Sequence, residues 1–167
     1  MAGTTDPFRL RVHKALTECL EGITPANGYT HDMDGRVARG RVVFGEEAEL
    51  PFIAILEPPL PIEQNNYRGE RGISTGEWDL MIQGFVKDDR KHPTDPAHLL
   101  MAEVKKRLAL EKRDGAKEQN ILGFQNKIRQ LAIGPGVVRP ADQVSDTAYF
   151  YLGITLTVAE NLEDPYQ

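Results

Sequence analysis

Residues 147–158 (TAYFYLGITLTV) alternate between apolar and more polar side chains, and this pattern decides the fold class. In an extended chain successive side chains point to opposite faces. One face then carries Ala148, Phe150, Leu152, Ile154, Leu156 and Val158, and the other carries threonines, tyrosines and Gly153. The segment predicts a β-strand with one face in a core and the other face either wetter or in contact with something.

Other stretches of the chain predict further strands. Residues 50–56 form a short apolar run, and residues 77–87 place Trp78, Leu80, Ile82 and Val86 on one face. Weaker patterns predict strands over residues 36–44 and 127–133. The alternation favours a mainly antiparallel sheet, in which one face packs on a core and the other can meet water.

Two amphipathic helices are predicted. The first begins at Thr5-Asp6-Pro7, where a capping side chain precedes a proline suited to the first turn, and ends at Thr24-Pro25. The second begins with the same device at Thr94-Asp95-Pro96. Apolar residues then recur at helical spacing, namely Val12, Ala15, Leu16, Cys19, Leu20 and Ile23 in the first helix and Ala97, Leu100, Met101, Val104 and Leu108 in the second. Together these segments predict an α+β fold with both helices packed on one face of the sheet.

Two long loops complete the expected fold, at residues 57–76 and 111–126. Structureless loops longer than about 12–15 residues are usually functional or disordered, so we expect residues 57–76 to contact a partner. Two readings are open for residues 111–126: a short helix that folds back on the core, or an interface arm. The acidic tail, residues 160–167, is expected to fray unless a neighbour holds it.

Composition sets limits on the function. The chain has 167 residues, with 20 Lys and Arg against 25 Asp and Glu, which gives a net charge of −5. This length predicts a single domain over residues 1–167, and the acidic balance argues against tight binding of nucleic acid. Cys19 is the only cysteine, so no intramolecular disulfide can form, which suits a reducing cytoplasm. We expect neither a signal peptide nor a membrane span, because no apolar run is long enough.

The sequence carries no recognisable catalytic signature. The serines are outside any Gly-x-Ser-x-Gly turn, and Cys19 falls on the apolar stripe of a helix. Two clusters of candidate metal ligands, His31, Asp32 and Asp34 and also His92, Asp95 and His98, lack the spacing of known metal motifs. We therefore predict a protein that is not an enzyme and has no cofactor. The alternative from another class is a small metal-dependent hydrolase or nuclease that uses the first cluster.

Arginine and tyrosine are enriched at protein contacts, and both types recur in segments predicted to be exposed. The candidate interface residues are Tyr67, Arg68, Glu70 and Arg71 in the first long loop, Lys117, Phe124 and Lys127 around the second, and Tyr149 and Tyr151 on the polar face of the last strand. The alternative for the two strand tyrosines is an ordinary half-exposed sheet face.

Several stretches resemble small proteins from the tail and neck of tailed bacteriophages and prophages. They are residues 5–16 (TDPFRLRVHKAL), 76–86 (GEWDLMIQGFV), 93–98 (PTDPAH), 133–140 (IGPGVVRP) and 159–166 (AENLEDPY). The order of helix, strands, long loop, helix and final strands is similar to that of tail terminator (tail completion) proteins. The similarity spans most of the chain, and its motifs are structural, with no catalytic signature.

The resemblance implies a virion protein, assembled in the host cytoplasm, that forms a ring, commonly a hexamer. Such a ring ends the polymerisation of the tail tube and docks the head connector, so its partners are copies of itself, the tail tube protein and neck proteins. DNA would pass through the lumen without specific binding, and no membrane is involved. The nearest alternatives are another head–tail joining protein and a tail assembly factor that is absent from the mature particle.

Overall fold

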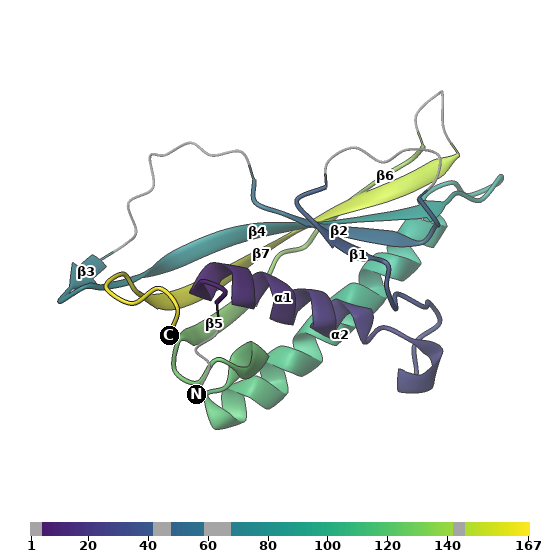
Figure 1. The fold of residues 1–167 in the computed structure, drawn as a ribbon. Helices are drawn as coiled ribbons and strands as arrows, with labels where there is room; N and C mark the ends of the chain where they lie inside the picture. The colour runs from purple at the N-terminus through teal and green to yellow at the C-terminus, as the bar shows by residue number, and fades with distance from the viewer. Residues whose placement is uncertain (1–4, 42–47, 59–67, 142–145) are drawn as a thin grey trace.

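The computed structural model describes residues 5–41, 48–58, 68–141 and 146–167, which form a β-sheet with two α-helices on one of its faces (Figure 1). The α+β architecture predicted from the sequence is confirmed. The helices are α1 (Phe8–Glu21) and α2 (Asp95–Glu118), with the short 3₁₀ helices η1 (Pro25–Asn27) and η2 (Ile121–Gly123). The strands are β1 (Val37–Arg39), β2 (Phe52–Leu56), β3 (Arg68–Glu70), β4 (Ile73–Lys87), β5 (Ile128–Ile133), β6 (Val137–Arg139) and β7 (Thr147–Asn161). Within the described ranges, neither α-helix contains an apolar stretch that could span a lipid bilayer.

The seven strands of the described chain form one mixed sheet in the order β1-β2-β4-β7-β5. β3 pairs with β4, and β6 pairs with β7. β1 runs parallel to β2, whereas every other pairing is antiparallel. The pairing of β4 with β7 is the longest, because its register runs without a break from Ile73 opposite Asn161 to Lys87 opposite Thr147. This pair forms the long axis of the molecule (Figure 1).

The core lies between the helices and one face of the sheet. The predicted alternation of the two long strands is confirmed, since Trp78, Leu80, Ile82 and Val86 of β4 and Ala148, Phe150, Leu152, Ile154, Leu156 and Val158 of β7 are all buried. They share one apolar cluster with Leu16 and Leu20 of α1 and Leu100, Val104 and Leu108 of α2. Full burial of a large apolar side chain contributes about 1.5–3 kcal/mol, so this layer holds the helices on the sheet.

The bounds of the strands differ from those predicted. The strand predicted over residues 36–44 covers only β1, and residues 42–44 lie outside the described chain. The strands predicted over residues 50–56 and 127–133 begin one or two residues later, at Phe52 and Ile128. β4 begins earlier than predicted, at Ile73, and β7 ends later, at Asn161. Tertiary pairing adds these residues, which the local pattern does not mark as strand.

The loop predicted over residues 57–76 is shorter than expected. Its last part forms the hairpin of β3 and β4, with a tight turn at Arg71 and Gly72. Both turn residues have a positive φ, 52° for Arg71 and 75° for Gly72. Glycine adopts this conformation readily, so Gly72 suits the second position of the turn. The middle of the loop, residues 59–67, lies outside the described chain.

The helices begin where predicted but without the predicted capping side chains. Pro7 is the N-cap residue of α1 and Thr94 is that of α2, and neither N-terminus has a side-chain cap hydrogen bond. Asp6 instead accepts a hydrogen bond from Lys14 Nζ at 2.5 Å, so its carboxylate is engaged about two turns further along α1. The proline in the first turn of α2 agrees with the prediction.

The prediction of a loop over residues 111–126 is wrong in its first half, because α2 continues to Glu118. The chain then folds back on the core, with Ile121 and Leu122 buried, which confirms the first of the two readings for this segment. Gly115 makes the return possible. A Cβ atom at this position would lie 2.7 Å from Cα of Ile121, so only glycine lets the two backbones approach this closely.

The C-terminal tail is held by backbone hydrogen bonds to neighbouring segments of the chain, which is the condition under which the sequence predicted that it would not fray. The Leu162 N–H donates to the carbonyl of Gly72, and the Pro165 carbonyl accepts from the N–H of Phe8 at 2.7 Å. Asn161 Oδ1 also accepts hydrogen bonds from the backbone N–H groups of Glu163 and Asp164. These bonds hold the tail against the hairpin turn and the start of α1, at the same end of the sheet (Figure 1).

Cys19 packs between the two helices, as its place on the apolar stripe predicted. Burial raises the pKa of its thiol to about 11, against the opposing effect of the Arg107 guanidinium. The thiolate is the reactive form, so we expect labelling by Ellman's reagent at pH 8 to be at least about 100-fold slower in the native protein than in guanidinium chloride. Equal rates in the two conditions would contradict this buried position.

Candidate interaction surface

The face of the sheet opposite the helices is the main candidate for a functional surface. It carries the odd-numbered residues of β4 and β7, which are paired directly across the two strands. The register of β2 places Phe52, Ala54 and Leu56 on this face, and that of β6 adds Val137 and Arg139. In the described chain both α-helices lie on the other side of the sheet, so we call this side the helix-free face (Figure 1).

Three aromatic rings meet near one end of the helix-free face. The ring centroids of Phe85 and Tyr149, which are cross-strand partners, lie 6.2 Å apart. The rings of Tyr149 and Tyr151 are 5.3 Å apart at an interplanar angle of 78°. All three side chains are half-buried. Burial raises the pKa of Tyr151, as does the neighbouring Tyr149, while Arg139 acts in the opposite direction.

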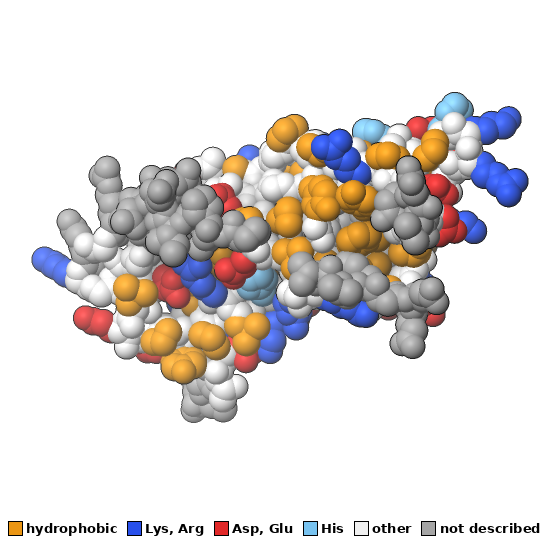
Figure 2. Space-filling model, turned by 90° about the horizontal axis from the view of Figure 1, so that it is seen from above, with side chains coloured by type: hydrophobic (Ala, Val, Ile, Leu, Met, Phe, Trp, Pro, Cys, Tyr) orange, Lys and Arg blue, Asp and Glu red, His pale blue; other side chains and the backbone are white. Residues whose placement is uncertain are grey.

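Basic and apolar side chains surround these rings. Arg139 is opposite Tyr149 in the pairing of β6 with β7, and Lys87 ends β4 on the same face. The Arg41 guanidinium lies 5.7 Å from the centroid of the Phe52 ring. Figure 2 shows a group of hydrophobic side chains over this part of the sheet. We define the aromatic half of the helix-free face as Met81, Phe85, Lys87, Val137, Arg139, Tyr149 and Tyr151.

The structure brings together two of the residues predicted as interface candidates, Tyr149 and Tyr151, and adds others that the sequence did not indicate. Phe85 and Val137 lie beside them because of the strand register. The alternation of residues 77–87 already placed Phe85 on the face opposite Trp78, which was the only local signal for it. For Val137, at 49% exposed, the three-residue strand β6 gives no usable pattern.

The candidates from the first long loop lie at the other end of the molecule. Tyr67 is outside the described chain. Arg68 and Glu70 form the ends of β3, although their side chains are outside what the structure describes. Arg71 is exposed in the hairpin turn. These residues therefore do not meet the two tyrosines, which lie toward the opposite end of β7.

The third group of candidates, Lys117, Phe124 and Lys127, lies around the return from α2 to β5. Phe124 is engaged inside the fold, since its ring packs edge-on to Phe8 with centroids 5.5 Å apart, and the Arg11 guanidinium lies 5.7 Å from its centroid. Burial and Arg11 lower the pKa of Lys127, whereas Asp164 raises it. Lys117 is exposed in the last turn of α2. This group thus offers two cations but not a free aromatic ring.

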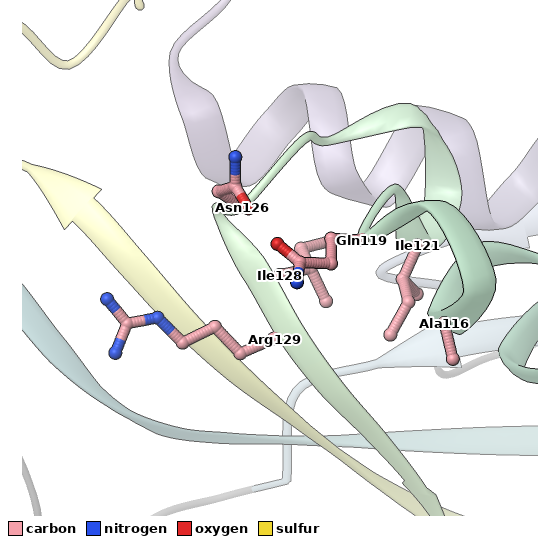
Figure 3. Close-up of a pocket in the computed structure, with 6 residues that line it drawn as sticks. All are labelled: Ala116, Gln119, Ile121, Asn126, Ile128 and Arg129. Atoms are coloured by element: carbon pink, nitrogen blue, oxygen red, sulfur yellow. The ribbon is translucent and has the colours of Figure 1, made fainter.

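A shallow pocket of about 390 Å³ opens beside this group (Figure 3). It is lined by Ala116, Gln119, Ile121, Asn126, Ile128 and Arg129. The Arg129 side chain points away from the other lining side chains, across β7 (Figure 3). The backbone of Asn126 donates to the carbonyl of Gln119 at 2.9 Å, which closes the loop that forms the pocket. The lining offers amides and aliphatic groups, which suits packing rather than acid–base chemistry.

The residues that a metal-dependent hydrolase or nuclease would use as ligands make other contacts in the structure. His31 Nδ1 lies 2.6 Å from Glu103 Oε2, and Asp32 Oδ1 accepts the backbone N–H of Asp34 in a local turn. Among the described residues, no three His, Cys, Asp or Glu side chains lie close enough together to hold a metal ion. In the second cluster, the backbone N–H of His92 donates a hydrogen bond to Asp89 Oδ1.

A second concavity, of about 510 Å³, lies between α1 and β2 and is lined by Leu10, His13, Arg39, Gly40, Ile55, Leu56 and Glu57. His13 Nε2 is 3.2 Å from Glu57 Oε1, and its ring packs edge-on to Trp78. Arg39 donates to Thr17 Oγ1 at 2.9 Å. A histidine paired with a carboxylate is one part of a nucleophilic site, but these lining residues include no hydroxyl or thiol for it to activate.

No protein-family model matches the chain, and no curated protein is significantly similar to it.

Proposed function

We propose that this protein is a structural component of the tail or neck of a tailed bacteriophage, a tail terminator whose subunits form a ring. In this role the ring ends the tail tube, docks the head connector and lets DNA pass through its lumen. The observation that carries the proposal is the aromatic half of the helix-free face, where Phe85, Tyr149 and Tyr151 form a half-exposed cluster.

Protein contact is the best physical account of this cluster. An antiparallel sheet with one free face normally places polar side chains on that face. Aromatic residues and arginine, in contrast, are enriched at the centres of protein interfaces. Here Arg139 stands beside the tyrosines, and Val137 is half exposed next to them. A partner that covers this area would remove apolar surface from water.

The distribution of candidate contacts agrees with a ring. A closed ring of identical subunits forms through heterologous contacts, in which one surface of a subunit meets a different surface of the next. Arg71 and Lys127 lie near the hairpin end of the sheet, whereas the tyrosines lie toward the other end. The acidic composition also suits a conduit for DNA, since strong phosphate binding in the lumen would hinder passage.

The test is the mass of the protein in solution. We expect size-exclusion chromatography with light scattering to give one closed oligomer, and electron microscopy of that fraction to show rings. Tyr151→Asp places a charge within the aromatic cluster and should raise the concentration for half-assembly at least about tenfold, because a buried charge without a partner is costly. Lys112→Asp, on the exposed surface of α2, is the matched control and should assemble normally. A wild-type protein that stays monomeric at about 1 mM, a concentration that reveals even weak contacts, would contradict the proposal.

A further inference from the structure

The helix-free face carries aromatic and basic side chains toward one end of the β4–β7 pair and acidic side chains toward the other end. Its aromatic half, at the Lys87 end, carries two cations, Lys87 and Arg139, and both are exposed. Toward the hairpin end the same face carries Glu77 and Asp79, also exposed, opposite Thr157 and Thr155. Ile73, 47% exposed, continues this second part to the turn. We define the acidic half of the face as Ile73, Glu77, Asp79, Thr155 and Thr157.

The charges of the two halves are not neutralised by ion pairs within the described chain. None of Glu77, Asp79, Lys87 and Arg139 takes part in a salt bridge with another described residue. Asp79 accepts a hydrogen bond from the Thr155 hydroxyl at 2.7 Å, which keeps the carboxylate at the surface of the sheet. On β4, β6 and β7 each half therefore carries charges of one sign, and the exposed Arg129 of β5 points across β7 (Figure 3).

The charged groups of the two halves are too far apart to meet within one molecule. Lys87 lies eight positions beyond Asp79 along β4, which is about 27 Å at 3.3–3.4 Å per residue. Both halves lie on the same face of the β4–β7 pair. The charged groups of one half can therefore form ion pairs with those of the other half only in another molecule.

We infer that the acidic half of one copy packs on the aromatic half of the next copy, so that the chain assembles head to tail through its helix-free face. This contact brings Glu77 and Asp79 against Lys87 and Arg139 while it covers the aromatic cluster. The inference rests on the ring proposed above and specifies which surfaces meet in it. A heterologous contact leaves one unfilled half at each end of a chain of subunits, so the assembly continues until it closes.

A second copy fits the aromatic half better than a nucleic acid does. Single-stranded nucleic acids stack their bases on flat aromatic faces, but the rings of Tyr149 and Tyr151 meet at 78° and pack against each other. Rings that pack edge-on with an arginine beside them are typical of the centre of a protein interface.

The experiment uses two charge-reversal variants of the full chain, Lys87→Glu with Arg139→Glu and Glu77→Lys with Asp79→Lys. We expect each variant alone to need at least about tenfold more protein for half-assembly than the wild type, because like charges then face each other at the contact. Mixed in equal amounts, the two variants should recover the wild-type mass, because reversed cations then meet reversed carboxylates. The control, Lys112→Glu with Arg113→Glu on α2, makes the same change of charge at exposed positions and should leave the mass unaltered.

The outcomes separate this contact from the proposed function. If the wild type forms a larger oligomer but neither variant changes it, the contact is wrong while the ring stands. A wild-type mass of two chains would indicate a two-fold dimer and would overturn the head-to-tail arrangement. A monomeric wild type would overturn both proposals. Recovery of the mass in the mixture also shows that each variant is folded, and circular dichroism of the separate variants checks this independently.

Discussion

Replacement of Gly84 by alanine is expected to lower the free energy of unfolding by about 3 kcal/mol or more. A Cβ atom at Gly84 would lie 2.0 Å from Cε1 and 2.4 Å from Cζ of Phe150, its partner across the β4–β7 pair. The Phe150 ring is completely buried, so it cannot move aside without displacing other core residues. Overpacking of this kind typically costs 1–3 kcal/mol, occasionally more, and a clash this close belongs at the upper end. Urea unfolding followed by circular dichroism measures the change.

The matched control is Gly153→Ala, because Gly153 lies in β7 on the helix-free face and a Cβ atom there would meet nothing within 4 Å. Its free energy of unfolding should stay within about 0.5 kcal/mol of the wild type. Combining Gly84→Ala with Phe150→Leu should cost less than the two changes taken separately, because the smaller side chain removes the clash. A loss below about 0.5 kcal/mol for Gly84→Ala would show that the ring does not fill this space.

The second large effect is expected at Glu103 of α2, which holds the segment between η1 and β1. Its carboxylate accepts the N–H of Thr30 at 2.6 Å and the N–H of His31 at 3.0 Å, and it pairs with the His31 ring. This segment buries Tyr29 and Met33. Glu103→Gln places an amide NH₂ against these donors and removes the charge, so we expect a loss of about 2 kcal/mol at pH 7, in the range of hydrogen bonds to charged groups.

The loss should depend on pH. Burial by itself would raise the pKa of Glu103, but the hydrogen bonds from Thr30 and His31 outweigh it and lower the pKa below the ordinary value of 4.5. A lowered pKa stabilises the fold fully above the unfolded value, and this contribution is lost as the pH falls through the folded value. The difference in unfolding free energy between wild type and Glu103→Gln should therefore shrink below about pH 4.5. A difference for Glu103→Gln that does not change with pH would rule out the charge as its cause.

The sequence was sufficient to predict the layers of the fold, because they depend on periodicity. The alternation of residues 147–158 correctly assigned the buried face of β7, and the apolar spacing after Pro7 and Pro96 correctly located both helices. The strand β6 could not be predicted, since three residues after Gly136 are too few to show a period. The extent of α2 was also missed, because residues 111–118 are mostly charged and include Gly115, whose place in the helix is explained by contact with Ile121.

The candidate surface was predictable only in part. Local alternation places Tyr149 and Tyr151 on one face of a strand, and it does not show which side chains lie next to them. That information is in the register, which sets Phe85 opposite Tyr149 and Val137 opposite Tyr151. The division of the face into acidic and aromatic halves likewise could not be predicted from one strand, because no single strand carries all of the charged and aromatic residues.

The β4–β7 pair has a consequence for biosynthesis. Its partners lie about 60 or more positions apart in the chain, and contacts of such long range form slowly, after the closure of a large loop. β7 follows β4 by about 60 or more positions, so β4 leaves the ribosome before its main partner does. Unfinished chains thus lack both the completed sheet and the paired aromatic cluster. Only a chain that includes β7 can complete the aromatic half of the helix-free face.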